Sequence, residues 1–394
     1  MSEWKEYRFT EAATLTNGRA YLQPELQEAG KYKIVRVGNL SGGDNWFYSD
    51  LELPEDKYCH KGDLLYAWAC SFGPYIWNED KTIYHYHIWK VDVNKALTDK
   101  YYLYYYLKYY TPKWMGLTNG SVMMHITKGS LEKQLIRLPD LNTQRQIASI
   151  LSSLDDKIAV NKKICENLEA QAQALFKHWF VDFAPFKDGK FVESELGLIP
   201  EGWRVGTLGD IAELRKPSIK PQDNILYTHY SIPAFDNSKK PTVDEGSTIK
   251  SNKFGINDGA VLLSKLNPST KRIWYTGKVP EHSVSSTEFL PFYSKNKEFT
   301  PFIYCYLNCD KNYREIANGA KGTTNSHQRI DANSILIRGL AYSEEVIRDF
   351  CDCCKNFMKL ILEANQESSR LSTLRDTLLP KLMSGQIKMN EIAL

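Results

Sequence analysis

The chain has 394 residues, of which 42% are hydrophobic and 25% charged, and its formal net charge is +3. Such a length and composition predict two or three folded domains, each large enough to bury a core of its own. No stretch approaches the roughly 18 uninterrupted apolar residues of a membrane span, and residues 1–6 lack the basic start and apolar run of a secretory signal, so we expect a cytoplasmic protein.

In chain order, the first 141 residues indicate a globular domain of strands and a short helix. Segments rich in β-branched and aromatic residues, bounded by Gly, Asn or Asp, predict strands at 34–37, 63–66 and 83–93. Residues 101–109 predict a short helix that leads into an Asn-Gly turn. Basic and acidic side chains are balanced here, 17 of each.

Residues 142–181 predict a long coiled-coil helix, because apolar residues recur at alternating spacings of four and three over more than four heptads. Thr143 and Gln146 match a capping box at its start. Asn161 interrupts the stripe and is expected to set the register at some cost in stability. The predicted core positions are Ile147, Leu151, Leu154, Ile158, Leu168 and Leu175.

Residues 182–200 contain Pro and Gly and predict a linker. A second globular domain is expected over 201–342, with strands at 259–263 and 335–337 and a helix at 300–307. This segment carries 19 basic and 14 acidic side chains, an excess that permits nucleic-acid binding without proving it.

Residues 343–385 predict a second coiled-coil helix, followed by a tail over 386–394. Ser343 is placed to cap the helix and Gly385 to end it, and Pro380 is expected to kink its last turns. Glu367 is the polar residue within its stripe. The predicted core positions are Val346, Phe350, Phe357, Leu360, Leu371, Leu374 and Leu378.

The two halves resemble one another. Trp4 and Leu15 recur 199 residues later as Trp203 and Leu214, and the Asn119-Gly120 pair recurs as Asn318-Gly319. Each half then ends in one of the long helices. The pattern predicts an internal duplication of a mixed α+β domain followed by a helix.

At the junction of the halves, the run ALFKHWFVDFAPF (174–186) followed by SELGLIPEGW (194–203) resembles the central conserved region of type I restriction-modification specificity subunits. Residues 137–156 resemble the boundary between a recognition domain and its helix in that family. Residues 378–385 resemble the end of the C-terminal helix. The resemblance covers nearly the whole chain.

The resemblance implies an α+β fold with two globular α/β target-recognition domains, at 1–141 and 201–342. They would be separated by a long antiparallel two-helix coiled coil with pseudo-two-fold symmetry. Each domain would recognise one half of a bipartite site in double-stranded DNA, and the helices would set the spacing.

The same resemblance implies partners and excludes catalysis by the chain itself. Two modification (adenine methyltransferase) subunits would dock on the coiled coil, and restriction/translocase subunits would join to direct methylation and restriction. The chain would hold no cofactor, since S-adenosylmethionine, Mg and ATP are expected on the partner subunits.

Side chains in loops after strands are the candidates for contacts with base edges and phosphates. Taken singly, each is also explained as a solvated charge, a turn asparagine or a cap. The cluster at 265–272 is favoured because three cations lie within eight residues. The candidates are Asn39, Asn45, Ser71, Lys113, Asn119, Ser121, His125, Lys128, Lys239, Lys240, Lys253, Lys265, Asn267, Lys271, Arg272, Lys321, Asn325, His327 and Arg329.

Sequence motifs for a catalytic or metal-binding site are weak. Asp140, Asp155 and Lys157 match a nuclease pattern formally, but Asp155 and Lys157 fall within a predicted helix and would point in different directions. No metal-binding spacing of Cys or His stands out. Two alternatives remain open at this stage: a specificity subunit of a related enzyme, and a coiled-coil scaffold that does not bind DNA.

Overall fold

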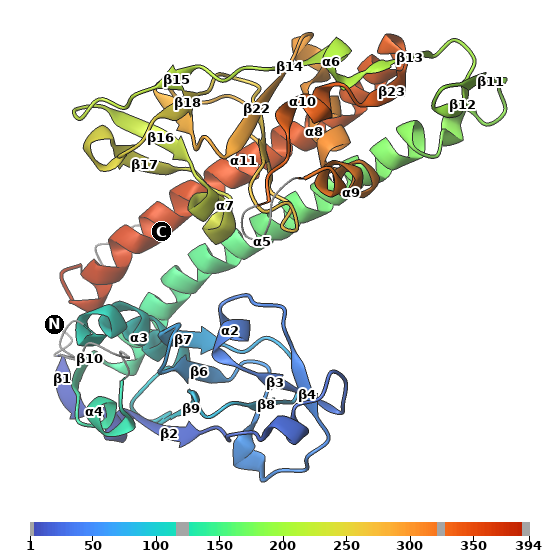
Figure 1. The fold of residues 1–394 in the computed structure, drawn as a ribbon. Coiled ribbons are helices and arrows are strands. Elements are labelled where there is room, and N and C mark those ends of the chain that lie inside the picture. The colour runs from blue at the N-terminus through green and yellow to red at the C-terminus, as the bar shows by residue number, and fades with distance from the viewer. Residues whose placement is uncertain (1–3, 116–125, 321–327, 388–394) are drawn as a thin grey trace. The chain divides into compact units, whose positions relative to one another are not determined.

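The computed structural model describes residues 4–115, 126–320 and 328–387. The chain divides into two compact units: unit 1 comprises residues 1–157 and 371–394, and unit 2 comprises residues 158–370. Two 40-residue helices, α5 (Leu141–Phe180) and α11 (Glu344–Met383), each contribute to both units (Figure 1). Among the helices in the described part of the chain, none has the length and apolar character needed to cross a membrane.

Unit 1 is built on an antiparallel sheet of order β2-β9-β6-β7 and a mixed sheet of order β4-β3-β8-β5. The pair β1-β10 lies where the chain enters and leaves this body, directly ahead of α5. The elements ahead of α5 are β1 (Lys5–Arg8), α1 (Phe9–Ala12), β2 (Ala13–Asn17), η1 (Gln23–Glu25), β3 (Tyr32–Val35), α2 (Val37–Leu40), β4 (Phe47–Ser49), η2 (Glu55–Lys57), β5 (Tyr58–Cys59), β6 (Leu64–Ala67), β7 (Gly73–Ile76), β8 (Thr82–Tyr84), β9 (Ile88–Val93), α3 (Lys100–Met115), α4 (Lys128–Glu132) and β10 (Leu135–Leu138).

Strand β6 explains how the core of unit 1 is layered, because all four of its residues are buried. Alternation along the strand sends Leu64 and Tyr66 to the core that contains α3, and Leu65 and Ala67 to the core that contains Val35 of β3. The first of these cores also receives side chains from both long helices: Ile147, Leu151, Leu379 and Leu382.

Unit 2 has an antiparallel sheet of order β14-β22-β19-β20, a five-stranded sheet of order β15-β18-β21-β16-β17, and the pair β13-β23. Its elements between the long helices are η3 (Ala184–Phe186), β11 (Phe191–Ser194), β12 (Gly197–Pro200), β13 (Arg204–Thr207), α6 (Leu208–Ile211), β14 (Ala212–Leu214), β15 (Ser218–Ile219), β16 (Leu226–Tyr230), α7 (Ile232–Ser238), β17 (Thr242–Glu245), η4 (Gly246–Thr248), β18 (Lys253–Gly255), β19 (Val261–Ser264), β20 (Ile273–Tyr275), β21 (Ser283–Ser285), β22 (Phe289–Ser294), η5 (Lys297–Phe299), α8 (Thr300–Asn308), α9 (Asp310–Asn318), α10 (Ala332–Leu336) and β23 (Gly339–Tyr342).

The predicted duplication is confirmed by the strand order, which is the same in both four-stranded sheets when β2, β9, β6 and β7 are matched with β14, β22, β19 and β20. The register repeats as well. Leu15 pairs with Val91 in unit 1, and Leu214 pairs with Phe292 in unit 2. Strand β15 is an addition to the second sheet of unit 2.

Within unit 2, α5 and α11 pack on each other and on α8. Phe176 of α5 lies 5.8 Å from Phe350 of α11 and 5.4 Å from Phe302 of α8, measured between ring centroids. The buried amide of Asn161 donates to the Glu367 carboxylate at 2.7 Å and to the carbonyl of Ala364 at 3.4 Å. The two polar residues predicted to interrupt the stripes therefore bond to each other.

The predicted core positions hold for α5 but are partly wrong for α11. Ile147 and Leu151 are buried, and Leu154, Ile158, Leu168 and Leu175 are half-buried. On α11, Phe350 is buried and Val346, Phe357, Leu371 and Leu378 are half-buried, whereas Leu360 and Leu374 are exposed.

The buried stripe of α11 in unit 2 instead follows Ile347, Cys351, Cys354, Met358 and Ile361, next to the predicted positions. Apolar residues occupy both rows of this helix, so spacing alone does not choose between them. The structure selects the row that faces the core of unit 2, which includes α8 as well as α5.

The ends of the long helices differ at one point from the predictions. α5 begins at Leu141 and is capped by Asp140, whose carboxylate accepts from the N–H groups of Asn142 and Thr143 and from the Thr143 hydroxyl, so the capping box at Thr143 is wrong. Ser343 caps α11 as predicted, accepting from the N–H of Val346 at 3.5 Å.

The predicted end of α11 at Gly385 is confirmed. Gly385 has φ +71°, and Gln386 donates its N–H to the carbonyl of Lys381, which is the Schellman arrangement. Pro380 lies inside the last turns of this helix.

Three predicted segments fold differently from the expectation. Residues 335–337 belong mainly to helix α10, where Asp331 provides an N-cap that the strand prediction overlooked. The strand at 83–93 is interrupted by a turn at 85–87 between β8 and β9. The linker segment contains the β11-β12 hairpin, in which Gly197 has φ +90°.

Substitutions at two adjacent positions test which of the two apolar rows of α11 is buried in the core. Ile361 is 4% exposed and Leu360 is 48% exposed. We expect Ile361→Ala to lower the free energy of unfolding by about 2–4 kcal/mol, because it leaves a cavity, and Leu360→Ala to change it by less than about 0.5 kcal/mol. Urea unfolding of the two full-length variants measures both values. A larger loss at Leu360 would contradict the stripe described above.

Candidate nucleic-acid interface

In unit 1, the loops after β3 and β6 bring three of the predicted contact residues into one region. Asn39 donates its amide to the carbonyls of Gly43 and Asn45, and it accepts from the N–H of Arg36. Ser71 donates to Ser41 at 3.1 Å, which joins the two loops. Asn39 thus shapes the loop, and the exposed Asn45 is the residue of this set that presents its side chain outward.

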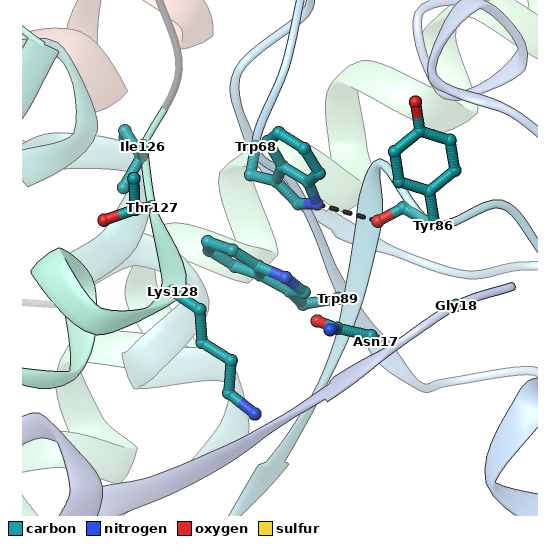
Figure 2. Close-up of a pocket in the computed structure, with 8 residues that line it drawn as sticks. All are labelled: Asn17, Gly18, Trp68, Tyr86, Trp89, Ile126, Thr127 and Lys128. Carbon is teal, nitrogen blue, oxygen red and sulfur yellow. Dashed lines mark hydrogen bonds between the residues drawn. The ribbon is translucent and has the colours of Figure 1, made fainter. Parts of the chain in front are cut away.

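Beside the sheet edge of unit 1 lies a pocket of about 290 Å³ (Figure 2). Its lining is aromatic: the rings of Trp68 and Trp89 stack at 5.9 Å, and the Trp68 indole donates to the carbonyl of Tyr86 at 2.8 Å. Asn17, at the end of β2, and Lys128, at the start of α4, add polar groups. Of these residues, only Lys128 was predicted as a contact.

The turn between β8 and β9, which supplies Tyr86 to the pocket, also contains two histidines. The rings of His85 and His87 lie 4.9 Å apart. Burial, with smaller contributions from His87 and Arg36, lowers the pKa of His85 to about 4, and burial lowers the pKa of His87. Both rings are therefore neutral near pH 7, so they add no positive charge for a phosphate.

The other unit 1 candidates are at or beyond the end of α3. Lys113 is exposed, and its ammonium lies 3.6 Å from the ring centroid of Tyr109, a cation–π contact. Lys128 pairs with Glu132 at 3.7 Å on α4. Asn119, Ser121 and His125 lie outside the described residues.

In unit 2, the connection between β19 and β20 brings Lys265, Asn267 and Arg329 together. Leu266 forms a β-bridge with Arg329, and the N–H of Asn267 donates to the carbonyl of Gln328. Asn267 has φ +49°, a left-handed conformation that asparagine tolerates. Lys265 is half-buried, and its backbone forms two hydrogen bonds: its N–H donates to the carbonyl of Glu288, and its carbonyl accepts from the N–H of Ile330.

Several predicted cations are already paired with carboxylates. Arg272 forms a two-pronged pair with Asp236, at 2.6 and 2.9 Å, and Arg329 forms one with Glu288, at 3.1 and 3.2 Å. Lys271 donates to Asp310 at 2.7 Å. These three cations are therefore locally neutralised and offer less charge to DNA than their positions in the sequence suggest, because their carboxylate partners are distant along the chain.

The remaining unit 2 candidates differ in how far their side chains are exposed to solvent. Lys240 is exposed, whereas Lys253 is 8% exposed and donates to the Ser251 hydroxyl and carbonyl. Burial lowers the pKa of Lys253. Lys239 pairs with Glu169 of α5 at 2.7 Å. Lys321, Asn325 and His327 lie outside the described residues.

Among the described residues, no group of three or more Cys, His, Asp or Glu side chains is arranged to hold a metal ion. Asp155, part of the formal nuclease match, pairs with Arg375 of α11. Cys305 and Cys354 are buried, while Cys70 and Cys353 are exposed, and Cys70 lies outside the strands.

Comparison with known proteins assigns the chain to a family. Residues 1–170 match the family described as "Type I restriction modification DNA specificity domain". The specificity subunit of the type I restriction enzyme MjaIX from Methanocaldococcus jannaschii is 31% identical over 310 residues, covering 74% of this chain and 70% of that protein. The chain belongs to the family of type I restriction enzyme specificity subunits.

Further relatives extend this assignment to the full length. The HindI specificity subunit from Haemophilus influenzae is 23% identical, over 98% of this chain and all of that protein. The crystal structure of a specificity subunit from M. genitalium has the same fold, with a TM-score of 0.61 at 16% identity and 96% coverage of each chain. A DNA-specificity role as a non-catalytic subunit, expected from the sequence, is thereby confirmed.

In this specificity subunit, a matched pair of lysine substitutions tests whether Lys265 of unit 2 contacts DNA. We expect Lys265→Gln to weaken binding to random duplex DNA and to reduce the slope of log affinity against log salt by about 1, as for one lost phosphate contact. The buried Lys253 is the control, and Lys253→Gln should leave the slope unchanged. Equal slopes for Lys265→Gln and the parent would remove Lys265 from the interface.

The histidine turn gives a pH prediction. The unfolded chain takes up a proton on His85 near its usual pKa of 6.5, whereas the folded protein does so only near 4. The unfolded state therefore binds more protons between these values, and stability should fall as pH falls from about 6.5 to about 4.

Urea unfolding across this pH range should show a flatter dependence for His85→Gln. His178→Gln, at an exposed position on α5, serves as the control and should follow the parent. An unchanged pH dependence in His85→Gln would show that other groups govern this range.

Proposed function

We propose that the two globular bodies, residues 1–141 and 201–342, each recognise one half of a bipartite site in double-stranded DNA. We further propose that α5 and α11 set the gap between the half-sites. The supporting observation is the repeat: the same four-stranded sheet occurs twice in one register, and each copy is followed by a 40-residue helix. Two copies of one recognition domain, connected by stiff helices, suit a DNA site made of two half-sites separated by a gap.

Within each body, the proposed contacts are side chains outside the strands that the structure leaves at least partly exposed. In unit 1 these are Asn45, Ser71 and Lys128, and in unit 2 they are Lys240, Lys265 and Asn267. Amide and hydroxyl groups suit base edges, and lysines suit phosphates. We do not include Lys271, Arg272 and Arg329, because each pairs at 3.1 Å or less with a carboxylate distant in the sequence, a closer pairing than that of Lys128 with Glu132 at 3.7 Å.

The chemistry would belong to partners. We propose that two adenine methyltransferase subunits dock on the exposed faces of α5 and α11, and that restriction/translocase subunits join them. S-adenosylmethionine, Mg and ATP would be bound by those subunits, and the target adenine would leave the duplex for the pocket of a methyltransferase. Such a complex would act on DNA in the cytoplasm.

The spacer role is tested by lengthening both helices. One heptad is inserted after Lys157 in α5 and one after Arg370 in α11, where unit 1 and unit 2 meet along the sequence. A heptad preserves the packing stripe. It adds about 10 Å, or about three base pairs of B-DNA. Methylated adenines are then mapped in the genome of a strain carrying this variant.

We expect the same two half-sites with a gap about three base pairs longer. A heptad inserted into α5 alone is the control, and it should abolish methylation because it breaks the pairing of the helices. Retained methylation with an unchanged gap in the double insertion would rule out the spacer role.

A further inference from the structure

In unit 1, one carboxylate of α5 joins three elements. Asp155 accepts a hydrogen bond of 2.8 Å from the hydroxyl of Tyr105, which lies on α3 of the globular body. Arg375, on α11, pairs with the other oxygen of the same carboxylate. Lys108, one turn beyond Tyr105 on α3, lies 3.8 Å from Asp155. The body and both long helices thus meet at this side chain.

This junction is largely shielded from solvent, and its hydrogen bonds require a defined orientation of the groups that form them. The side chains of Arg375 and Asp155 are 18% and 26% exposed, and Tyr105 is buried. Burial and the charge of Asp155 raise the pKa of Tyr105, so its hydroxyl remains a donor. Charge-assisted hydrogen bonds demand a narrow geometry, whereas apolar contacts permit sliding.

A comparable junction occurs in unit 2, two heptads further along α5. Lys239 donates to Glu169 at 2.7 Å from the end of α7, where its φ of +51° turns the chain. Tyr304 of α8 is fully buried near the same carboxylate: burial and then the charge of Glu169 raise its pKa. Tyr304 follows Tyr105 by 199 residues, the spacing of the repeat.

We propose that Asp155 and Glu169 are positioning residues that fix how each recognition domain is mounted on α5, and so restrict the half-site gap to one value. Asp155 bonds to Tyr105 of α3 and pairs with Arg375, and Glu169 pairs with Lys239 and carries the charge that acts on the buried Tyr304 of α8. This inference rests on the proposed function, because a gap exists only if the two domains recognise two half-sites.

Isosteric variants test the proposal in the full chain. Asp155→Asn and Glu169→Gln remove one charge without changing volume. Glu166→Gln is the matched control, because Glu166 is exposed and pairs along the helix with Lys162 at 3.9 Å. Tyr105→Phe and Tyr304→Phe remove only a hydroxyl and provide a second route if a carboxylate variant fails to fold. Each variant is expressed with its partner subunits, and methylated adenines are mapped.

We expect Asp155→Asn and Glu169→Gln to raise methylation at gaps one base pair longer or shorter by about tenfold over the parent, with both half-site sequences retained. Tyr105→Phe and Tyr304→Phe should do the same more weakly, and Glu166→Gln should match the parent. Such a change in gap tolerance is not expected from a loss of stability alone.

Reduced methylation with the parental gap distribution in the carboxylate and tyrosine variants would overturn the proposal, since it would assign these groups to stability only. So would an unchanged methylation pattern in all of them. If the parent itself shows no fixed gap, the proposed function fails independently of these variants.

Discussion

The structure depends on the burial of α5 and α11 in two separate cores. The first turns of α5 contribute Ile147 and Leu151 to the core of unit 1, and its later turns contribute Ala172 and Phe176 to the core of unit 2. Burying a large apolar side chain stabilises the fold by about 1.5–3 kcal/mol. Each helix is therefore held in place by buried side chains near both of its ends, a tertiary support that an isolated amphipathic helix would lack.

Polar groups inside these apolar surfaces restrict the ways in which they can pack. The hydrogen bond from Asn161 to Glu367 satisfies a buried amide at one axial position of α5 and α11, and a slip of one turn would leave that amide without its partner. Asp155 imposes a similar requirement in unit 1. The apolar residues thus supply most of the stability, and a few polar residues select a single arrangement of the helices.

Much of the fold follows from the sequence because duplication and heptad spacing are long-range patterns that local errors do not erase. The choice between Leu360 and Ile361 could not be made this way, since both rows of α11 are apolar and the packing of α8 decides. The site was less predictable. Arg272 looks available in the sequence, but its partner Asp236 lies on a different element and is brought to it only by folding. Charge in a loop becomes informative only once its neighbours in space are known.

The junction at Asp155 also bears on how a duplicated chain avoids pairing its own halves wrongly. When α5 and α11 are aligned from their caps, Asp155 corresponds to Met358, and Arg375 corresponds to Ala172. Met358 and Ala172 are both buried in the apolar core of unit 2. If the equivalent helix segments exchanged places during folding, Asp155 or Arg375 would enter this apolar core without its partner, at a cost of several kcal/mol. The sequence difference at these two pairs of equivalent positions therefore makes each helix segment fit only its own half of the molecule, even though both halves share one topology.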